Sequence, residues 1–214
     1  MNQQDSIRHW DEKALTRKAD PRVVAAFAAP KLAMIRRHLS APTPTILEVG
    51  CGDGYLSRFL VEFGELTGAD ASEGMLARNP IPNKIRADAC ALPFLDNSFD
   101  IVVCSNMLHH LPEPARAVSE MARVSKSLLF LSEPNGRNPA MFITHAIEPD
   151  ERGALKFNTG LLTRLLEAAG MQVIEKRSAG QVTPNKTPIW MLPFLQWWES
   201  FSPFGMFAMA IGKK

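Results

Sequence analysis

Three glycines spaced two residues apart are the most distinctive chemical feature of this sequence. Gly50, Gly52 and Gly54 belong to the pentapeptide GCGDG, which lies between an apolar, β-branched run and an amphipathic helical pattern over residues 55–63. Glycine lets a chain turn sharply, and the amides at a helix start can donate hydrogen bonds to a ligand lying against the backbone. The pentapeptide therefore predicts a ligand-binding turn after a strand.

Asp53 lies inside this turn and indicates the charge of the ligand. The dinucleotide fingerprint GxGxxG needs glycine at position 55, where Tyr55 stands, and a phosphate-binding P-loop needs Gly-Lys-Ser or Gly-Lys-Thr, which does not follow. A carboxylate repels a diphosphate but attracts an ammonium group. Asp53 thus favours the methionyl end of S-adenosylmethionine, a cationic sulfonium amino acid. Tyr55 argues against a nicotinamide-dependent oxidoreductase.

Polar side chains also follow the next three predicted strands. Asp70 comes 20 residues after Gly50, where a carboxylate can accept hydrogen bonds from both ribose hydroxyls. Asp88 follows the third strand and can accept from the amino group of adenine. The alternatives are structural: a helix N-cap for Asp70 and a turn aspartate for Asp88. Ser105 and Asn106 follow the fourth strand.

Alternating strands and helices must position these residues. Apolar runs at 45–49, 66–69, 85–87, 99–104, 127–131, 171–176 and 207–211 are predicted strands, with helices between them at 55–63, 73–78, 114–124 and 159–169. This alternation predicts an α/β fold with a doubly wound, seven-stranded, mostly parallel sheet. Ligands bind such sheets at the carboxyl ends of the strands, where the strand order reverses. All four polar clusters therefore point to one crevice.

The 214 residues are expected to form a single domain with three parts. Residues 1–40 read as a helical cap, broken or bent near Pro30, residues 41–134 as the cofactor-binding half and residues 135–214 as the substrate half. Within the last part, residues 187–207 are rich in aromatic side chains and are expected either to form a lid over the substrate or to pack on the sheet or on a second copy in a homodimer. Contact with a membrane surface ranks below both. The expected lid residues are Trp190, Phe194, Trp197 and Trp198.

Composition disfavours several other classes of protein. With 24 Lys and Arg against 22 Asp and Glu, the net charge of +2 gives no sign of a nucleic-acid partner. Cys51, Cys90 and Cys104 lack CxxC spacing, so neither a disulfide framework nor a metal site is expected. The N-terminal residues have no apolar segment typical of a signal peptide, and no run reaches the roughly 18 apolar residues of a membrane span. A cytoplasmic protein is expected.

The stretch from Ile46 to Gly54 resembles motif I of the class I S-adenosylmethionine-dependent methyltransferases. The resemblance continues through GADAS at 68–72, ADA at 87–89, SFD at 98–100 and LHHL at 108–111. It is nearest to the branch that methylates small molecules, and it implies the Rossmann-like methyltransferase fold with S-adenosylmethionine as cofactor and S-adenosylhomocysteine as product. Relatives often carry a tyrosine near the N-terminus, which this sequence lacks.

The resemblance also implies which residues bind the cofactor. Glu48 would order the glycine turn, and the turn with Asp53 would meet the methionyl part. Asp70 would hold the ribose, Asp88 and its neighbour the adenine, and Asn106 would lie beside the methionyl end. The full expected set is Glu48, Gly50, Cys51, Gly52, Asp53, Gly54, Asp70, Ala71, Met75, Asp88, Ala89, Ser105 and Asn106.

Methyl transfer from a sulfonium is an in-line displacement, so the protein mainly positions the acceptor and excludes water. A general base is needed only where the acceptor arrives protonated. Candidates are His110 and His109, after the fourth strand, and Glu133, after the fifth; each could instead hold loop backbone. We expect methylation of a small apolar or aromatic metabolite, with oxygen favoured over carbon and nitrogen as acceptor. The alternatives are a tRNA methyltransferase and a catalytically silent cofactor-binding subunit.

Overall fold

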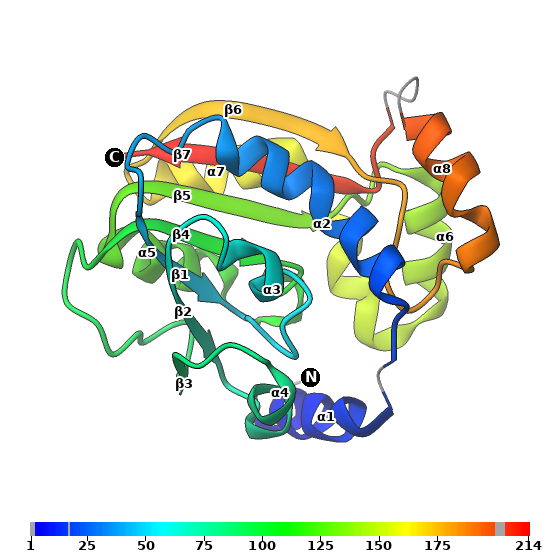
Figure 1. The fold of residues 1–214 in the computed structure, drawn as a ribbon, viewed down its shortest axis with the longest axis horizontal. Coiled ribbons are helices and arrows are strands. Elements are labelled where there is room, and N and C mark those ends of the chain that lie inside the picture. The colour runs from blue at the N-terminus through cyan, green and yellow to red at the C-terminus, as the bar shows by residue number, and fades with distance from the viewer. Residues whose placement is uncertain (1–2, 17, 200–203) are drawn as a thin grey trace.

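A seven-stranded sheet forms the centre of the fold (Figure 1). The computed structural model describes residues 3–16, 18–199 and 204–214. Within these ranges the strand order is β3-β2-β1-β4-β5-β7-β6, and the pairs are parallel except where β7 meets β5 and β6. The predicted doubly wound, mostly parallel sheet is confirmed. The strands are β1 (Thr45–Val49), β2 (Glu65–Asp70), β3 (Lys84–Arg86), β4 (Phe99–Ser105), β5 (Ser125–Pro134), β6 (Gln172–Ala179) and β7 (Phe207–Lys213).

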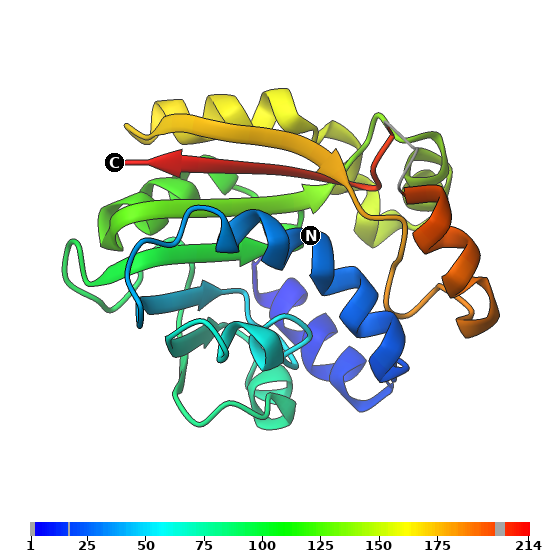
Figure 2. The same ribbon diagram turned by 45° about the horizontal axis from the view of Figure 1, so that its top comes forward.

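Helices cover both faces of this sheet and the carboxyl ends of its parallel strands (Figures 1 and 2). Helices α2 and α3 lie on one face, α5 and α7 lie on the other, and α6 and α8 lie beyond the ends of β4 and β5. No α-helix within the described ranges is both long enough and apolar enough to cross a bilayer. The helices are α1 (Gln3–Thr16), α2 (Pro21–Arg36), α3 (Ser57–Leu60), α4 (Glu73–Arg78), α5 (Pro114–Val124), α6 (Pro139–Ile147), α7 (Thr159–Ala168) and α8 (Leu192–Glu199), with short 3-10 helices η1 (Leu108–His110), η2 (Pro149–Lys156) and η3 (Ile189–Met191).

The N-terminal helices differ from the expected cap. Helix α2 continues through Pro30, with Phe27 and Ala28 before it and Met34 and Ile35 after it all buried. Burial on both sides of the proline offsets the roughly 3 kcal/mol that an interior proline costs. Helix α2 is thus a layer of the core, and α1 alone packs against α4 at the edge of the sheet. The helix expected over 55–63 is likewise shorter, with only Ser57–Leu60 in α-helix.

Side chains of the central strands alternate between two apolar cores, one on each face of the sheet. Ile46 of β1 and Ile101 of β4 are fully buried in the core that α2 covers. Their neighbours Leu47 and Val102 are fully buried in the core that α5 and α7 cover. A strand covered on both faces needs a continuous apolar run, which is the pattern the sequence shows.

The parallel register places the carboxyl ends of β1, β2 and β4 side by side at one end of the sheet. Val49 of β1 is paired with Ala69 of β2 and with Cys104 of β4. The residues that follow, including Gly50 and Asp70, therefore emerge side by side. The strand order also reverses here, because β2 lies on one side of β1 and β4 on the other.

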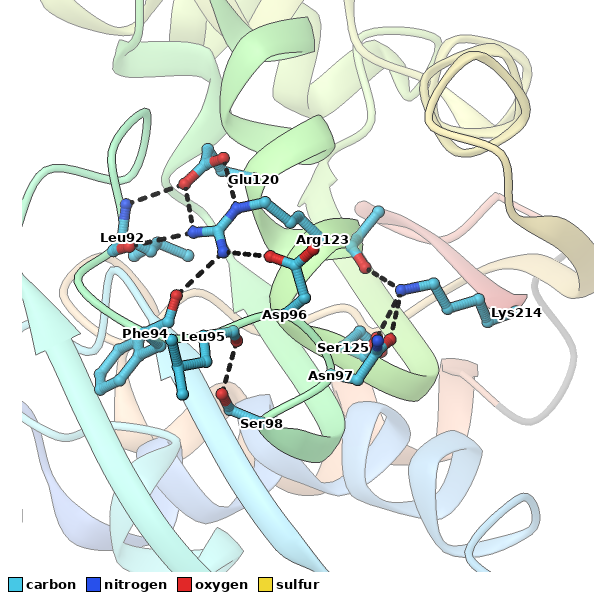
Figure 3. Close-up of polar contacts among 11 residues, drawn as sticks. Leu92, Phe94, Leu95, Asp96, Asn97, Ser98, Glu120, Arg123, Ser125 and Lys214 are labelled. Atoms are coloured by element: carbon cyan, nitrogen blue, oxygen red, sulfur yellow. Dashed lines mark hydrogen bonds and ion pairs between the residues drawn. The ribbon is translucent and has the colours of Figure 1, made fainter.

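A polar network at the amino ends of β4 and β5 connects the loop before β4 to α5 (Figure 3). The Arg123 guanidinium donates to Glu120 (2.8 Å) and Asp96 (2.7 Å) and to the carbonyl oxygens of Leu92 and Phe94. Lys214 Nζ donates to Asn97 Oδ1 and to two backbone carbonyls at the end of α5. The network fixes the start of β4.

We expect Arg123→Lys to lower the free energy of unfolding by about 1–2 kcal/mol, because lysine cannot reproduce the guanidinium fork that serves five acceptor atoms on four residues. Cofactor affinity should not change, since the network lies far from the carboxyl ends of the strands. Urea denaturation measures the loss. Arg116→Lys, on the exposed side of the same helix, is the control and should change stability by less than about 0.5 kcal/mol. Equal losses in both variants would contradict the role given to Arg123.

Candidate active site

Two adjoining cavities lie at the carboxyl ends of β1, β2 and β4. The larger has a volume of about 690 Å³ and the smaller about 120 Å³. They meet at five residues that line both: Trp10, Gly50, Gly52, Asn106 and His110. The sequence analysis predicted a crevice at this edge, and three of these five residues were expected to bind the cofactor.

The glycine turn presents bare backbone to both cavities. Gly50 and Gly52 have φ of 74° and 50°, in the left-handed region that favours glycine. A Cβ on Gly50 would lie 2.6 Å from Met107 Cγ, whereas one on Gly52 would approach only Met75 Cε, at 4.0 Å. Gly50 is therefore needed for packing, and Gly52 leaves open space that a ligand can fill.

The amides of this turn are less available than the sequence suggested. Gly50 N and Cys51 N both donate to Ala69 O, and Gly52 N donates to Asp70 Oδ2. The pairing of β1 with β2 continues into the turn and uses these donors. The turn therefore offers a ligand a close approach to the backbone rather than a row of free amides.

Asp70 joins the end of β2 to the glycine turn. Its Oδ2 accepts from Gly52 N at 2.8 Å and its Oδ1 accepts from Ser72 N at 2.9 Å. The carboxylate therefore has a fixed orientation on the wall of the smaller cavity. Each carboxylate oxygen can accept a further hydrogen bond, so the structural role leaves room for ribose hydroxyls.

The residues expected to contact adenosine gather around the smaller cavity, which Asp70, Ala71, Met75, Asp88 and Ala89 line. Asp88 Oδ1 accepts from Cys90 N at 2.9 Å, which is the turn role considered as its alternative. Among the described residues, none is hydrogen-bonded to the other carboxylate oxygen of Asp88 so as to hold it in this turn. The cavity thus combines apolar walls with two carboxylates.

The residues expected at the methionyl end are the glycine turn with Asp53, and Asn106. All of them but Gly54 line the larger cavity, as do Glu48 and Ser105 of the expected cofactor set. Gly54 lines neither cavity. A Cβ on Gly54 would lie 2.7 Å from Asn79 Oδ1, so this glycine serves packing and its expected contact with cofactor is not part of the observed geometry.

Asn106 has two properties typical of a binding residue. Its φ of 57° lies in the left-handed region, which costs a non-glycine residue free energy and is common at functional sites. Its side-chain Oδ1 is buried and has no hydrogen-bond partner within the described part of the chain. A buried carbonyl without a partner costs about 1–3 kcal/mol. A ligand ammonium group in the adjoining space would relieve that cost.

Glu48 is a buried carboxyl behind the glycine turn, and it accepts a short hydrogen bond from Ser57 Oγ. Burial raises the pKa of Glu48 to about 8; the Ser57 hydrogen bond opposes this shift, and the negative charge of Asp70 adds to it. At neutral pH the carboxyl is mostly protonated. Glu48 is therefore mostly a neutral group that pairs with Ser57, and its role in ordering the turn stays a prediction.

His109 is held between two carboxylates. Its Nδ1 lies 2.5 Å from Glu133 Oε2, and its Nε2 lies 3.2 Å from Glu151 Oε2. Burial alone would lower the pKa of His109, but the two carboxylates outweigh it and raise the pKa to about 9. The pKa of Glu151 is correspondingly held far below its usual range.

Glu133 is fully buried and lines neither cavity. Its Oε1 accepts from Met107 N at 3.0 Å and Leu108 N at 2.9 Å. This is the loop-holding role that was the alternative to base catalysis. Glu133 positions His109 and the turn of η1, and it has no access to an acceptor in either cavity.

His110 lies where the two cavities meet. Burial and the adjacent positive charge of His109 hold the pKa of His110 well below its usual range. The Trp10 ring packs edge-on against it at 4.9 Å between centroids. Asp11 fixes this part of α1, because its Oδ1 accepts from Ser72 Oγ at 2.5 Å and from Gly74 N at 2.9 Å. Trp10 of α1 therefore covers the site. It belongs to the N-terminal region, where this sequence lacks the tyrosine that relatives often carry.

The four expected lid residues point away from the larger cavity. Trp190, Phe194, Trp197 and Trp198 are between 47% and 76% exposed and do not belong to either cavity lining, whereas Met191 and Leu195 of the same segment line the larger cavity. The segment thus turns Met191 and Leu195 toward the cavity and leaves the four aromatic side chains exposed to solvent. The segment covers the cavity through its aliphatic face. Self-association through the aromatic face stays a prediction.

Sequence reasoning did not include Glu151 among the site residues and gave His145 a structural role. Both lie in the connection between β5 and α7, His145 on α6 and Glu151 on η2, and both line the larger cavity. The only signal was the length of this connection, which exceeds what a strand-to-helix turn requires.

Comparisons with known proteins identify relatives of this chain. A family described as "Methyltransferase domain" matches residues 47–128. A demethylmenaquinone methyltransferase from Renibacterium salmoninarum is 40% identical over 92 residues, covering 41% of this chain and 39% of that protein. A ubiquinone biosynthesis O-methyltransferase from Bordetella bronchiseptica is 31% identical over 169 residues, covering 64% of this chain and 68% of that protein. The chain spans between 39% and 52% of the length of the first curated relatives it matches.

Solved structures share the fold. An S-adenosylmethionine-dependent methyltransferase from Thermotoga maritima superposes with a TM-score of 0.68 at 20% identity, covering 90% of this chain and 91% of that one. The fold, the glycine turn and the relatives together define the class. The chain belongs to the class I S-adenosylmethionine-dependent methyltransferases.

The raised pKa of Glu48 predicts a specific pH dependence of stability. The folded chain keeps the proton to about pH 8, whereas the unfolded chain releases it near the ordinary value of 4.5. The unfolded state binds fewer protons in this window, so the contribution of Glu48 to stability falls as the pH rises from about 5 to 8. We expect Glu48→Gln to remove this fall, measured by urea unfolding at several pH values.

Glu62→Gln, which changes an exposed carboxyl, is the control and should keep the wild-type dependence. A Glu48→Gln profile parallel to the wild-type profile would show that Glu48 is ionised in the folded chain.

Proposed function

We propose that this protein transfers a methyl group from S-adenosylmethionine, bound across both cavities, to a small-molecule acceptor in the larger one. The observation that carries the proposal is the distribution of the expected residues. Those expected for adenosine line the smaller cavity, those expected for the methionyl end, except Gly54, line the larger, and Gly50, Gly52 and Asn106 line both.

The residues present fit this cofactor. The open space at Gly52 accepts a ligand against the backbone, and Asn106 Oδ1 supplies a buried acceptor without a partner. We assign the ribose hydroxyls to Asp70 and the adenine amino group to Asp88. Asp53, buried in the wall of the larger cavity, supplies negative charge for the ammonium end.

S-Adenosylmethionine, when bound, supplies a methyl group activated by the positive charge of its sulfur. The chain then has to orient the acceptor, exclude water and receive any proton that the acceptor loses. His110 and Asn106, at the junction of the cavities, lie where the acceptor must approach. Trp10 lines both cavities and Leu195 lines the larger one, so an N-terminal and a C-terminal side chain together reduce the access of water.

The acceptor proposed here is a small aromatic metabolite methylated on oxygen. The larger cavity joins apolar walls, such as Met191 and Leu195, to polar groups such as Thr144 and Lys186. Such a lining suits a ring with polar substituents. Relatives named for demethylmenaquinone methylation and for ubiquinone biosynthesis support a small-molecule acceptor.

Transfer of a labelled methyl group into a metabolite extract and into bulk RNA tests this proposal. Label in the small-molecule fraction is expected. Label in the RNA fraction would instead identify an RNA methyltransferase. Cofactor binding without transfer to either fraction would identify a cofactor-binding subunit without activity of its own.

Asp70→Ala should weaken the binding of S-adenosylhomocysteine by about 2–5 kcal/mol, which is typical for the loss of a buried, charged hydrogen-bond partner. Isothermal titration calorimetry measures the loss, and a thermal melt without ligand separates it from unfolding. Asp96→Ala, which changes a carboxylate of the Arg123 network (Figure 3), is the matched control and should bind as the wild type does. Unchanged affinity in Asp70→Ala would reject the ribose assignment.

A further inference from the structure

A cluster of imidazole and carboxylate groups lies in the wall of the larger cavity. One ligand atom each of His109, His110 and Glu151 falls within 4.8 Å of the other two. His145 extends the cluster, since its Nε2 lies 4.0 Å from Glu151 Oε2. The four residues come from η1, α6 and η2, so only the folded chain brings them together.

His109 has the orientation that a metal ligand requires. Its Nδ1 is engaged by the buried Glu133 at 2.5 Å, and this leaves Nε2 directed at Glu151, 3.2 Å away. Histidines that bind metals usually donate their other ring N–H to a carboxylate, which fixes the ring and its tautomer. Glu133 is itself fixed by the amides of Met107 and Leu108. Glu133 and these two amides therefore already hold the His109 ring in the orientation of a metal ligand.

Two other imidazole nitrogens in the cluster lack partners. His110 Nδ1 and His145 Nδ1 are buried, and neither has a hydrogen-bond partner within the described part of the chain. A buried polar atom without a partner costs about 1–3 kcal/mol. These two unpartnered nitrogens belong to rings of the same cluster, His145 facing Glu151 through its other nitrogen, Nε2, and they are a second sign that a group interacting with imidazole belongs in this space.

We propose that His109, His110 and Glu151 bind a divalent transition-metal ion, with His145 as a further ligand and Glu133 supporting His109 from behind. Imidazole nitrogens with one carboxylate favour Zn²⁺ and similar ions over Mg²⁺ or Ca²⁺, which prefer oxygen ligands. Two ligands of a tetrahedral Zn²⁺ at about 2.0–2.1 Å lie roughly 3.3 Å apart. The 3.2 Å between His109 Nε2 and Glu151 Oε2 matches this separation. The rings of His110 and His145 would rotate to bring one nitrogen each within reach of the ion.

The proposed ion faces the space assigned to the methyl acceptor, because all four residues line the larger cavity. A metal ion held there by these residues would supply Lewis-acid chemistry, lowering the pKa of an acceptor hydroxyl that it binds. This consequence rests on the proposed function, whereas the metal site itself does not.

Equilibrium dialysis against Zn²⁺ tests the site directly. The chain is stripped with a chelator, dialysed against micromolar Zn²⁺, and its metal content is measured by mass spectrometry. We expect one Zn²⁺ per chain in the wild type and at least tenfold weaker binding in Glu151→Gln and in His145→Gln. The matched control is Glu148→Gln, whose carboxylate lines the same cavity but pairs with Lys186 at 2.7 Å; it should bind as the wild type does.

Co²⁺ substitution gives a second readout. Bound Co²⁺ should show visible absorption bands typical of nitrogen and oxygen ligands, and these bands should be lost in Glu151→Gln. Thermal melts of the metal-free variants check folding. Wild-type chain without stoichiometric Zn²⁺, or Glu151→Gln that binds it as tightly as Glu148→Gln does, would overturn the proposal and leave the cluster as a network of charge pairs.

Titration with S-adenosylhomocysteine separates the two proposals. Zn²⁺ binding that persists in a chain without methyl transfer would contradict the proposed function alone. Normal cofactor binding and transfer in a chain that never binds Zn²⁺ would contradict the metal site alone.

Discussion

The register of β1 against β2 and β4 is the constraint on which the rest of the structure depends. Because Val49 is paired with both Ala69 and Cys104, the residues that follow the three strands emerge at one edge. Asp70 then connects the end of β2 to the glycine turn, because its carboxylate accepts hydrogen bonds from Gly52 N and Ser72 N. A shift of one residue in any of these strands would turn its apolar side chains to the opposite core and move its polar end away from the cavities.

Ionised carboxyl groups are distributed unevenly around the two cavities, because burial and neighbouring charges determine which of them keep a proton. Burial makes Glu48 mostly neutral at pH 7, whereas the buried Glu133 and the partly buried Glu151 lie against the charged ring of His109. The cofactor side thus keeps its negative charge on Asp53 and Asp70, close to where a sulfonium amino acid would bind. The acceptor side holds a compact cluster in which His109 is paired with two carboxylates.

Much of this arrangement was predictable because its signals are local. Strand periodicity, the GCGDG turn and the aspartates after β2 and β3 each depend on a few neighbouring residues, and the fold they predicted is confirmed. The errors concern contacts between distant segments. Composition marked 187–207 as aromatic, but the packing of η3 and α8 decided that Met191 and Leu195 face inward. Likewise, nothing near Glu151 in the sequence shows that it meets His109, which lies 42 positions earlier.

The account depends most on the claim that one cofactor spans the two cavities. A crystal structure of the chain with S-adenosylhomocysteine tests that claim directly. The account predicts adenosine in the smaller cavity, with both ribose hydroxyls on Asp70 and the amino acid end beside Asn106. A nucleoside bound elsewhere, or one whose ribose leaves Asp70 without contact, would contradict it.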